Sequence, residues 1–219
     1  DDIVLLSPTG SGKTLSYLLP LSQLVDASSD EVQAVVVVPG RELALQSANV
    51  LKNMGSGLRG MACYGGRPTM DEHRKLREVK PQIIFATPGR LNDHLDKLNI
   101  VADNIKYLVI DEFDKCLEMG FHDEMQSLIS KLPSDVRSIL LSATPAEELK
   151  DQKIINNKFT TLNFLPDEEQ VPDRVHIYKV ESPQKDKLET LRQLLLTFRD
   201  GSSIVFLNFR DSVERTAEF

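Results

Sequence analysis

Short apolar runs alternate with longer amphipathic segments along most of this chain. The runs have the length of β-strands and lie near residues 3–7, 34–38, 60–64, 82–87, 106–111, 137–142 and 159–164. The segments between them have helical spacing, and Thr144 and Glu147 have the spacing of a capping box that predicts a further helix start. Strands that alternate with helices in this way predict an α/β fold, with helices covering both faces of a parallel sheet.

The pattern changes after the seventh run. Residues 165–172 are acidic, contain two prolines and are short of apolar residues, as is typical of an interdomain linker. We therefore expect one domain over residues 1–164 and an incomplete second α/β domain over residues 173–219. The elements predicted in the second domain are a strand, a helix and a strand, at residues 174–180, 188–198 and 203–207.

The first apolar run leads into a glycine-rich loop, residues 7–14, that reads Ser-Pro-Thr-Gly-Ser-Gly-Lys-Thr. It matches a phosphate-binding P-loop except that Ser7 stands where the strict pattern has glycine. Lys13 is placed to reach the outer phosphates of a nucleotide and the Thr14 hydroxyl to bind Mg²⁺, while an ordinary glycine–serine turn is the alternative. The candidate phosphate-binding residues are Ser7, Thr9, Gly10, Ser11, Gly12, Lys13 and Thr14.

An acidic string follows the buried run that ends at residue 110. It reads Asp111-Glu112-Phe113-Asp114, and the ends of parallel strands share one edge of a sheet with the glycine-rich loop. We expect Asp111 to bind Mg²⁺ and Glu112 to orient and deprotonate the attacking water of a phosphoryl transfer. A helix cap or a solvated loop is the alternative for an acidic strand end taken alone.

Four further strings occur in register with these two. They are Pro-Gly-Arg-Glu-Leu-Ala from residue 39, Gly-Gly from 65, Thr-Pro-Gly-Arg from 87 and Ser-Ala-Thr from 142. In this order the six strings resemble the DEAD-box RNA helicases, which are ATPases built from two RecA-like domains. The resemblance covers nearly the whole chain and implies a RecA-like first domain followed by the start of a second.

The resemblance implies roles for the matching residues in ATP and Mg²⁺ binding. Thr14 and Asp111 correspond to the metal-binding positions, and Asp114 to the last acid of the acidic string. Ser142 and Thr144 correspond to the string that couples nucleotide state to domain arrangement, so their hydroxyls are expected to meet Asp114.

The resemblance also implies a sequence-independent grip on the sugar-phosphate backbone of RNA. Guanidinium groups, helix starts and small residues suit that chemistry. The RNA-binding candidates are Pro39, Arg41, Glu42, Gly65, Gly66, Thr87, Pro88, Gly89 and Arg90. Protein adaptors are a further class of partner that the sequence does not identify.

Two residues depart from the family pattern. Phe113 stands where the family has alanine, which predicts altered local packing, and Gly40 stands where threonine is usual, which removes a hydroxyl. The chain also lacks the upstream glutamine-containing segment and the later arginine finger, so we expect a piece of a longer helicase with little or no activity alone.

Composition adds limits to this interpretation. The 26 basic and 33 acidic residues give a net charge of −7, so the assignment of RNA as a partner rests on the resemblance and not on electrostatics. No apolar run reaches membrane-spanning length, and two cysteines without metal-ligand spacing suit a reducing compartment, so we expect a cytoplasmic protein without a membrane partner. The four histidines are not expected to be catalytic, and residues 71–80 predict a solvated helix face.

Three functions of different kinds remain open from the sequence. The favoured one is an ATP-dependent RNA helicase that opens short duplexes or remodels RNA–protein complexes. The alternatives are an ATP-dependent RNA clamp or assembly scaffold, and a DNA helicase or translocase of the same superfamily.

Overall fold

A computed structural model describes the chain except for residues 1, 67, 145–158, 167–175, 184 and 199–200. Residues 145–147 of the predicted helix start and most of the predicted linker lie outside the described residues. The chain divides into two compact units, residues 1–168 and residues 169–219. The boundary lies within residues 165–172, and the domain limits proposed from the sequence stay a prediction.

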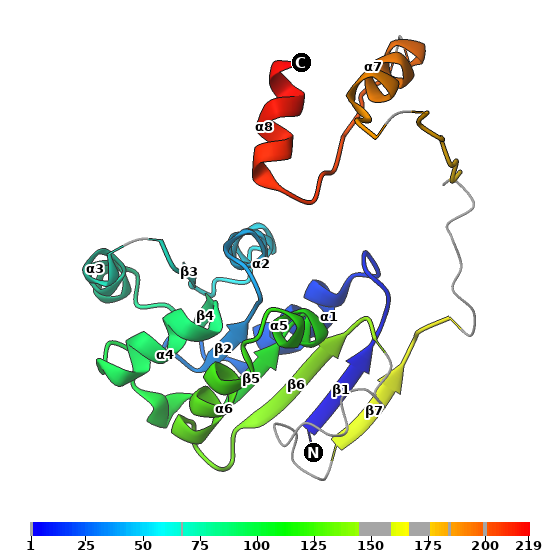
Figure 1. The fold of residues 1–219 in the computed structure, drawn as a ribbon. Coiled ribbons are helices and arrows are strands. Elements are labelled where there is room, and N and C mark those ends of the chain that lie inside the picture. The colour runs from blue at the N-terminus through cyan, green and yellow to red at the C-terminus, as the bar shows by residue number, and fades with distance from the viewer. Residues whose placement is uncertain (1, 67, 145–158, 167–175, 184, 199–200) are drawn as a thin grey trace. The chain divides into compact units, whose positions relative to one another are not determined.

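The first unit is built around a seven-stranded sheet of order β3-β4-β2-β5-β6-β1-β7, in which all paired strands are parallel (Figure 1). Its strands are β1 (Asp2–Leu6), β2 (Ala34–Val37), β3 (Gly60–Cys63), β4 (Ile83–Ala86), β5 (Tyr107–Ile110), β6 (Arg137–Ser142) and β7 (Phe159–Asn163). All seven strands predicted from the apolar runs are present.

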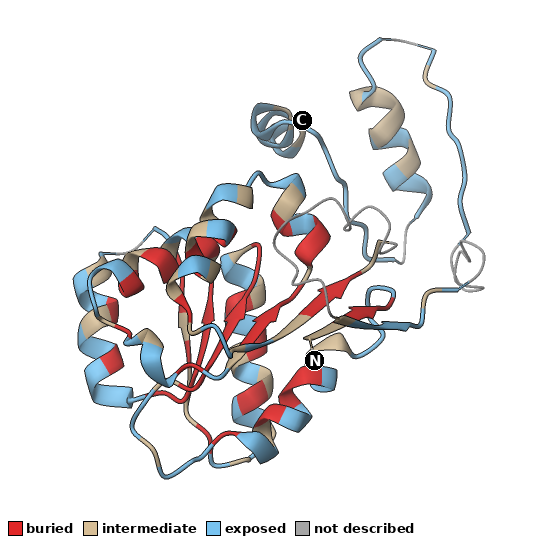
Figure 2. Cartoon of the chain, turned by 90° about the horizontal axis from the view of Figure 1, so that it is seen from below, coloured by how far each residue is buried: buried red, intermediate tan, exposed pale blue. Residues whose placement is uncertain are grey.

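Helices cover both faces of this sheet. They are α1 (Lys13–Leu24), α2 (Arg41–Asn53), α3 (Thr69–Val79), α4 (Pro88–Asp96), the 3-10 helix η1 (Ala102–Asn104), α5 (Phe113–Glu118) and α6 (His122–Lys131). Alternate residues of β2 face opposite clusters: Val35 and Val37 pack with α4, α5 and α6, whereas Ala34 and Val36 pack with α1 and α2. Buried residues therefore run along the strands and the inner sides of the helices (Figure 2), which confirms the predicted α/β fold.

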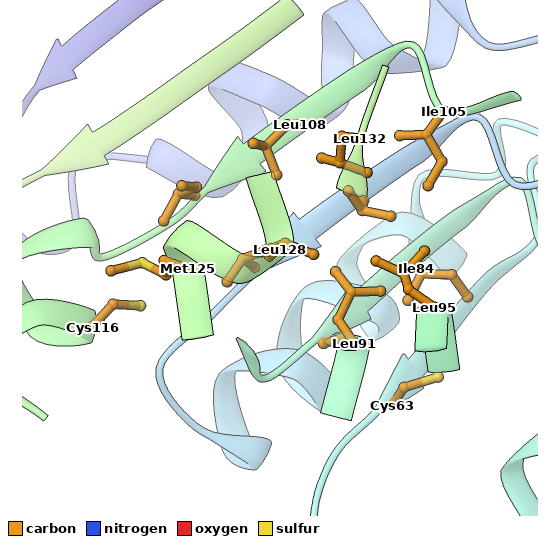
Figure 3. Packing of buried hydrophobic residues seen from close by; sticks show 14 of the residues in the cluster. Cys63, Ile84, Leu91, Leu95, Ile105, Leu108, Cys116, Met125, Leu128 and Leu132 are labelled. Atoms are coloured by element: carbon orange, nitrogen blue, oxygen red, sulfur yellow. The ribbon is translucent and has the colours of Figure 1, made fainter. Parts of the chain in front are cut away.

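The core between the sheet and α4, α5 and α6 includes both cysteines. Figure 3 shows Cys63 and Cys116 among leucine and isoleucine side chains of this cluster, together with Met125. Both are free thiols and both are buried. Burial, with a smaller contribution from the charge of Glu112, raises the pKa of the Cys116 thiol to about 12, so the thiol is protonated and packs as a small apolar group.

The second unit contains α7 (Leu188–Thr197) and α8 (Arg210–Glu218). The predicted helix is present as α7, but the strands predicted near residues 174–180 and 203–207 are wrong where the structure describes them. Residues 176–180 and 203–207 form no ladder with a neighbour. A strand is a paired structure, so β-type side chains without a hydrogen-bonded partner leave an extended segment only.

Among the described residues, no helix has the length and apolar character needed to cross a bilayer.

Candidate nucleotide site and nucleic-acid groove

The glycine-rich loop joins the end of β1 to the start of α1. Gly10 and Gly12 have φ values of 79° and 93°, a left-handed conformation that favours glycine, and α1 begins immediately after Gly12. The Ser7 amide continues the sheet by donating to the Ser142 carbonyl oxygen at 3.0 Å. The loop thus places the N-terminal amides of a twelve-residue helix at the carboxyl edge of the sheet.

Lys13 closes this loop in the structure. Its Nζ donates to the carbonyl oxygens of Ser7 at 2.7 Å and Pro8 at 3.0 Å. The hydroxyl groups of Ser7 and Ser11 are hydrogen-bonded to each other. The ammonium group and the helix amides form a donor set suited to a polyphosphate, since phosphate oxygens are stronger acceptors for a lysine than backbone carbonyls. The residues present therefore fit a bound nucleotide triphosphate.

Asp111 lies at the end of β5 and is only 2 % exposed. Its Oδ1 accepts the Glu112 amide hydrogen at 2.9 Å. Burial raises the pKa of Asp111, the Glu112 charge adds to that effect, and Lys13 opposes it. The carboxylate is therefore costly to ionise without a cation beside it, and a divalent ion would supply that charge. Asp111 and the half-buried Thr14 fit the predicted Mg²⁺ ligands.

Glu112 has an unusual backbone. It caps the N-terminus of α5 with φ 51° and ψ 51°, the left-handed region that glycine normally occupies. This conformation costs a glutamate roughly 1 kcal/mol. Non-glycine residues with such strain cluster at active sites, and here the turn places a half-buried carboxylate directly after Asp111.

Tyr17 is a site residue that the sequence analysis missed. It is fully buried on α1, four residues after Lys13, and its hydroxyl donates to Ser47 Oγ at 3.3 Å. Burial raises the pKa of Tyr17, and the nearby Asp111 charge raises it further. The phenol is therefore neutral and lies near the predicted metal ligand. Tyr17 lies one helical turn after Lys13, and this spacing is the feature of the sequence that could have placed it near the phosphate loop.

The structure gives the hydroxyls of the Ser-Ala-Thr string hydrogen bonds other than the one predicted to Asp114. Ser142 Oγ and Thr144 Oγ1 lie 3.1 Å apart, and the Thr144 amide also donates to Ser142 Oγ at 3.1 Å. Asp114 is 7 % exposed and bonds to neither hydroxyl. The hydroxyls are satisfied by each other two residues apart, a local arrangement that competes with any longer-range partner.

The two departures from the family pattern have different surroundings. Phe113 is completely buried and belongs to the cluster beneath α5, as expected from its size. Gly40 caps α2 with extended backbone, and a Cβ there would meet Glu42 Oε2 at an ordinary contact distance of 3.6 Å. The position has room for a side chain, so the glycine is not required by packing.

A hollow of about 560 Å³ lies at the ends of β2, β3 and β4. It is lined by Pro39, Gly40, Arg41, Tyr64, Gly65, Thr69, Thr87, Gly89, Arg90, Asp93 and Phe121. We call it the groove. It brings together six of the nine RNA-binding candidates, while Glu42, Gly66 and Pro88 are not among its lining residues. Three strings far apart in the chain therefore meet on one surface.

The two arginines of the groove differ in freedom. The Arg41 side chain is 68 % exposed and pairs with Glu42 at 2.6 Å, an ion pair that solvent screens. The Arg90 side chain is 9 % exposed, donates through Nη1 to Thr69 Oγ1 at 2.7 Å, and places Nε 3.6 Å from Glu72 Oε2. Arg41 is available to an anion as it stands, whereas Arg90 is held by the protein.

The family model described as DEAD/DEAH box helicase matches residues 1–152. CshA of Bacillus subtilis, named a DEAD-box ATP-dependent RNA helicase, is 32% identical over 224 residues that cover 99% of this chain and 44% of that protein. CshA of Limosilactobacillus reuteri, named an ATP-dependent RNA helicase, is 33% identical over 209 residues, 94% of this chain and 41% of its own length. The chain thus spans less than half the length of these curated relatives.

Solved structures give the same family. A DEAD box protein from Methanococcus jannaschii superposes with a TM-score of 0.69 at 28% identity, covering 99% of this chain and 58% of that chain. Mss116p, solved with single-stranded RNA and AMP-PNP, superposes with a TM-score of 0.66 at 29% identity, covering 74% of this chain and 36% of that chain. The phosphate loop, the acidic string, the fold and the match over residues 1–152 agree, and the chain belongs to the DEAD/DEAH box helicase family.

Proposed function

We propose that this chain is the nucleotide-binding part of an ATP-dependent RNA helicase, in which ATP binding and hydrolysis drive local duplex opening or RNA–protein remodelling. One observation carries the proposal. The N-terminus of α1 follows β1 and Asp111 follows β5, so both lie at the carboxyl edge of one parallel sheet, where the Lys13 charge partly opposes the rise in the Asp111 pKa that burial causes. A polyphosphate donor set therefore faces a carboxylate suited to a divalent cation.

Each residue of this edge has a part in the proposed chemistry. Lys13 and the amides from Gly10 to Thr14 bind the phosphates, and Thr14 and Asp111 hold Mg²⁺. Bound Mg²⁺ neutralises charge on the phosphates. Glu112 orients the attacking water and takes its proton. The neutral Tyr17 phenol adds no charge beside Asp111.

RNA is the proposed polymer because the groove gathers the matching strings. Arg41 presents an exposed guanidinium, and Gly65 and Gly89 leave the backbone approachable, as phosphate contacts without base readout require. Such contacts need few basic residues, so they are compatible with the net charge of −7. The structural relative Mss116p was solved with single-stranded RNA, which supports RNA as the polymer for the present chain.

We also propose a cytoplasmic location and protein adaptors as further partners. Cys63 and Cys116 are buried free thiols, a state that a reducing compartment preserves. The structural relative Dbp5 of S. cerevisiae was solved with Nup159 and Gle1, which supports adaptors as a partner class.

The test is ATP turnover of the full-length protein with single-stranded RNA, with DNA of the same sequence, and with neither, at one salt concentration. We expect RNA to stimulate turnover and DNA to have little effect. Equal stimulation by DNA would favour a DNA translocase, and tight RNA binding without turnover would favour a clamp. The 219-residue chain is assayed alongside, and we expect weak nucleotide binding and no RNA-stimulated hydrolysis from it.

A further inference from the structure

Glu72 is a buried carboxylate on α3, a helix that is rich in charged residues. The sequence predicts residues 71–80 as a solvated face, but the Glu72 residue is only 3 % exposed. Removing a carboxylate from water costs several kcal/mol unless charged or hydrogen-bonding partners offset it. The partners of Glu72 therefore indicate what the burial accomplishes.

Three donors from two segments surround this carboxylate. Oε1 accepts the Tyr64 amide hydrogen at 3.1 Å. Oε2 lies 2.9 Å from His94 Nε2 and 3.6 Å from Arg90 Nε. Tyr64 precedes the Gly-Gly pair after β3, whereas Arg90 and His94 belong to α4. The carboxylate thus joins the two chain segments that carry most of the RNA-binding candidates.

Backbone hydrogen bonding between these two segments ends at the ends of β3 and β4, and the Glu72 carboxylate lies directly beyond it. The Thr87 amide donates to the Cys63 carbonyl oxygen at 3.2 Å, at the ends of β4 and β3. Beyond that bond, Tyr64 and Arg90 both line the groove and both contact Glu72. The carboxylate therefore continues the connection where the sheet stops.

A second residue of α3 holds α4 in the same way. Thr69 Oγ1 accepts from Arg90 Nη1 at 2.7 Å and lies 2.8 Å from Asp93 Oδ2. Thr69 and Glu72 are three residues apart, so they share one face of the helix. Arg90 is therefore fixed from two points on that face.

We propose that Glu72 is a positioning residue for RNA binding, which holds the Tyr64–Gly65 turn and Arg90 at the spacing that a sugar-phosphate backbone requires. This inference rests on the proposed function of the groove. It assigns to Glu72 a role in polymer affinity that neither the family strings nor the comparisons record.

A metal ion is the alternative occupant of this cluster. Ligand atoms of Cys63, Glu72 and His94 lie within 4.8 Å of one another. However, both Glu72 oxygens already accept hydrogen bonds, and the Arg90 cation lies 3.6 Å from one of them. Burial also raises the pKa of the Cys63 thiol, which keeps it protonated and a poor ligand. The hydrogen-bonded role is therefore favoured.

The test compares Glu72→Gln with Glu78→Gln in the full-length protein. Both remove one negative charge from α3, but Glu78 is exposed and outside the groove. Affinity for single-stranded oligouridine is measured by fluorescence anisotropy at low salt, and nucleotide affinity with a fluorescent ADP. We expect Glu72→Gln to weaken RNA binding about tenfold, because that factor corresponds to the loss of one charge-assisted contact. Nucleotide affinity should stay within about twofold. Glu78→Gln should change neither.

Two further measurements separate positioning from general destabilisation. The slope of log affinity against log salt should fall by about 0.7 in Glu72→Gln, as expected when one phosphate contact is lost. His94→Phe removes a donor to Glu72 without altering a groove residue, and we expect RNA binding to weaken about threefold.

Three results would overturn the inference. Unchanged RNA affinity in both variants would exclude positioning, and equal losses of RNA and nucleotide affinity with a lower melting temperature would show a structural role only. Tight zinc binding that His94→Phe abolishes, with RNA affinity unchanged, would assign the cluster to a metal. Failure of the unaltered full-length protein to bind RNA at all would refute the proposed function itself.

Discussion

The phosphate loop and the groove lie at the same edge of one sheet but are held together in different ways. The loop is stabilised by local bonds, such as those from Lys13 Nζ to carbonyl oxygens five and six residues away. The groove depends on contacts between residues more than twenty positions apart, such as Thr69 with Asp93 and Glu72 with His94. Changes in the loop should therefore alter ligand binding with little effect on the fold, whereas changes in the groove network should affect both.

The largest effect is expected at the acidic string. Glu112→Gln removes the proposed base but keeps Asp111, so ATP turnover of the full-length protein should fall by about 10²–10⁴ while ATP and RNA remain bound. Turnover is followed by phosphate release, with Glu118→Gln on the exposed side of α5 as the matched control. Parental turnover in Glu112→Gln would show that another group takes the proton.

Lys13→Ala is the sharpest test of the local character of the loop. Among the described residues the side chain bonds to carbonyl oxygens of the loop, so we expect nucleotide affinity to fall about 100-fold and the melting temperature to stay the same. Titration calorimetry with ATP and Mg²⁺ and a thermal melt give the two readouts, with Lys52→Ala on α2 as the control. A large loss of stability would contradict the comparison between loop and groove.

Arg41→Ala examines the exposed side of the groove. Because its guanidinium is solvated and its ion pair in the described part of the chain is with Glu42, we expect RNA affinity to fall about fivefold and the salt slope to decrease by about 0.7, with no change in stability. Arg74→Ala, which removes an exposed arginine from α3, should leave RNA affinity unchanged. Equal losses of RNA affinity in the two variants would indicate that RNA is attracted by the general positive charge of the surface and not by the groove.

The smallest effect is a gain in stability. Burial raises the pKa of Asp111 in the folded chain, so the ionised carboxylate destabilises the fold at pH values above that pKa. Asp111→Asn should therefore stabilise the nucleotide-free chain by about 0.5–1 kcal/mol at pH 7 while abolishing Mg²⁺-dependent nucleotide binding. The gain should shrink as the pH falls through the raised pKa toward the ordinary value of 3.8, because both states then carry a proton. Denaturant melts at pH 7 and pH 4 measure it, and an unfavourable change at pH 7 would contradict it.

The sequence predicted the sheet well because its strands are continuous apolar runs between helices, a pattern that tertiary context rarely overrides. Residues 34–38 are an example, since Ala34, Val36 and Val38 face one cluster and Val35 and Val37 the other. The strands expected at 174–180 and 203–207 failed because a strand also needs a neighbour, which no local pattern specifies.

The sites divide along the same line. The phosphate loop could be predicted because its residues are consecutive and their spacing carries the chemistry. The burial of Glu72 could not, since its partner His94 lies 22 positions away on another helix. The left-handed backbone of Glu112 also has no local signal, because glutamate does not normally adopt it.

The buried Phe113 side chain packs beneath the acidic string, and a small apolar molecule is expected to take its place when it is truncated. Its phenyl ring is completely buried directly after Glu112 in the chain. Phe113→Ala should cost about 3–5 kcal/mol and leave a dry, ring-shaped void, the kind of apolar cavity that binds benzene. We expect benzene or a similar small aromatic compound to fill this void and raise the melting temperature of the variant. A thermal melt with and without benzene decides the matter, and an unchanged melting temperature would mean that the cavity had collapsed.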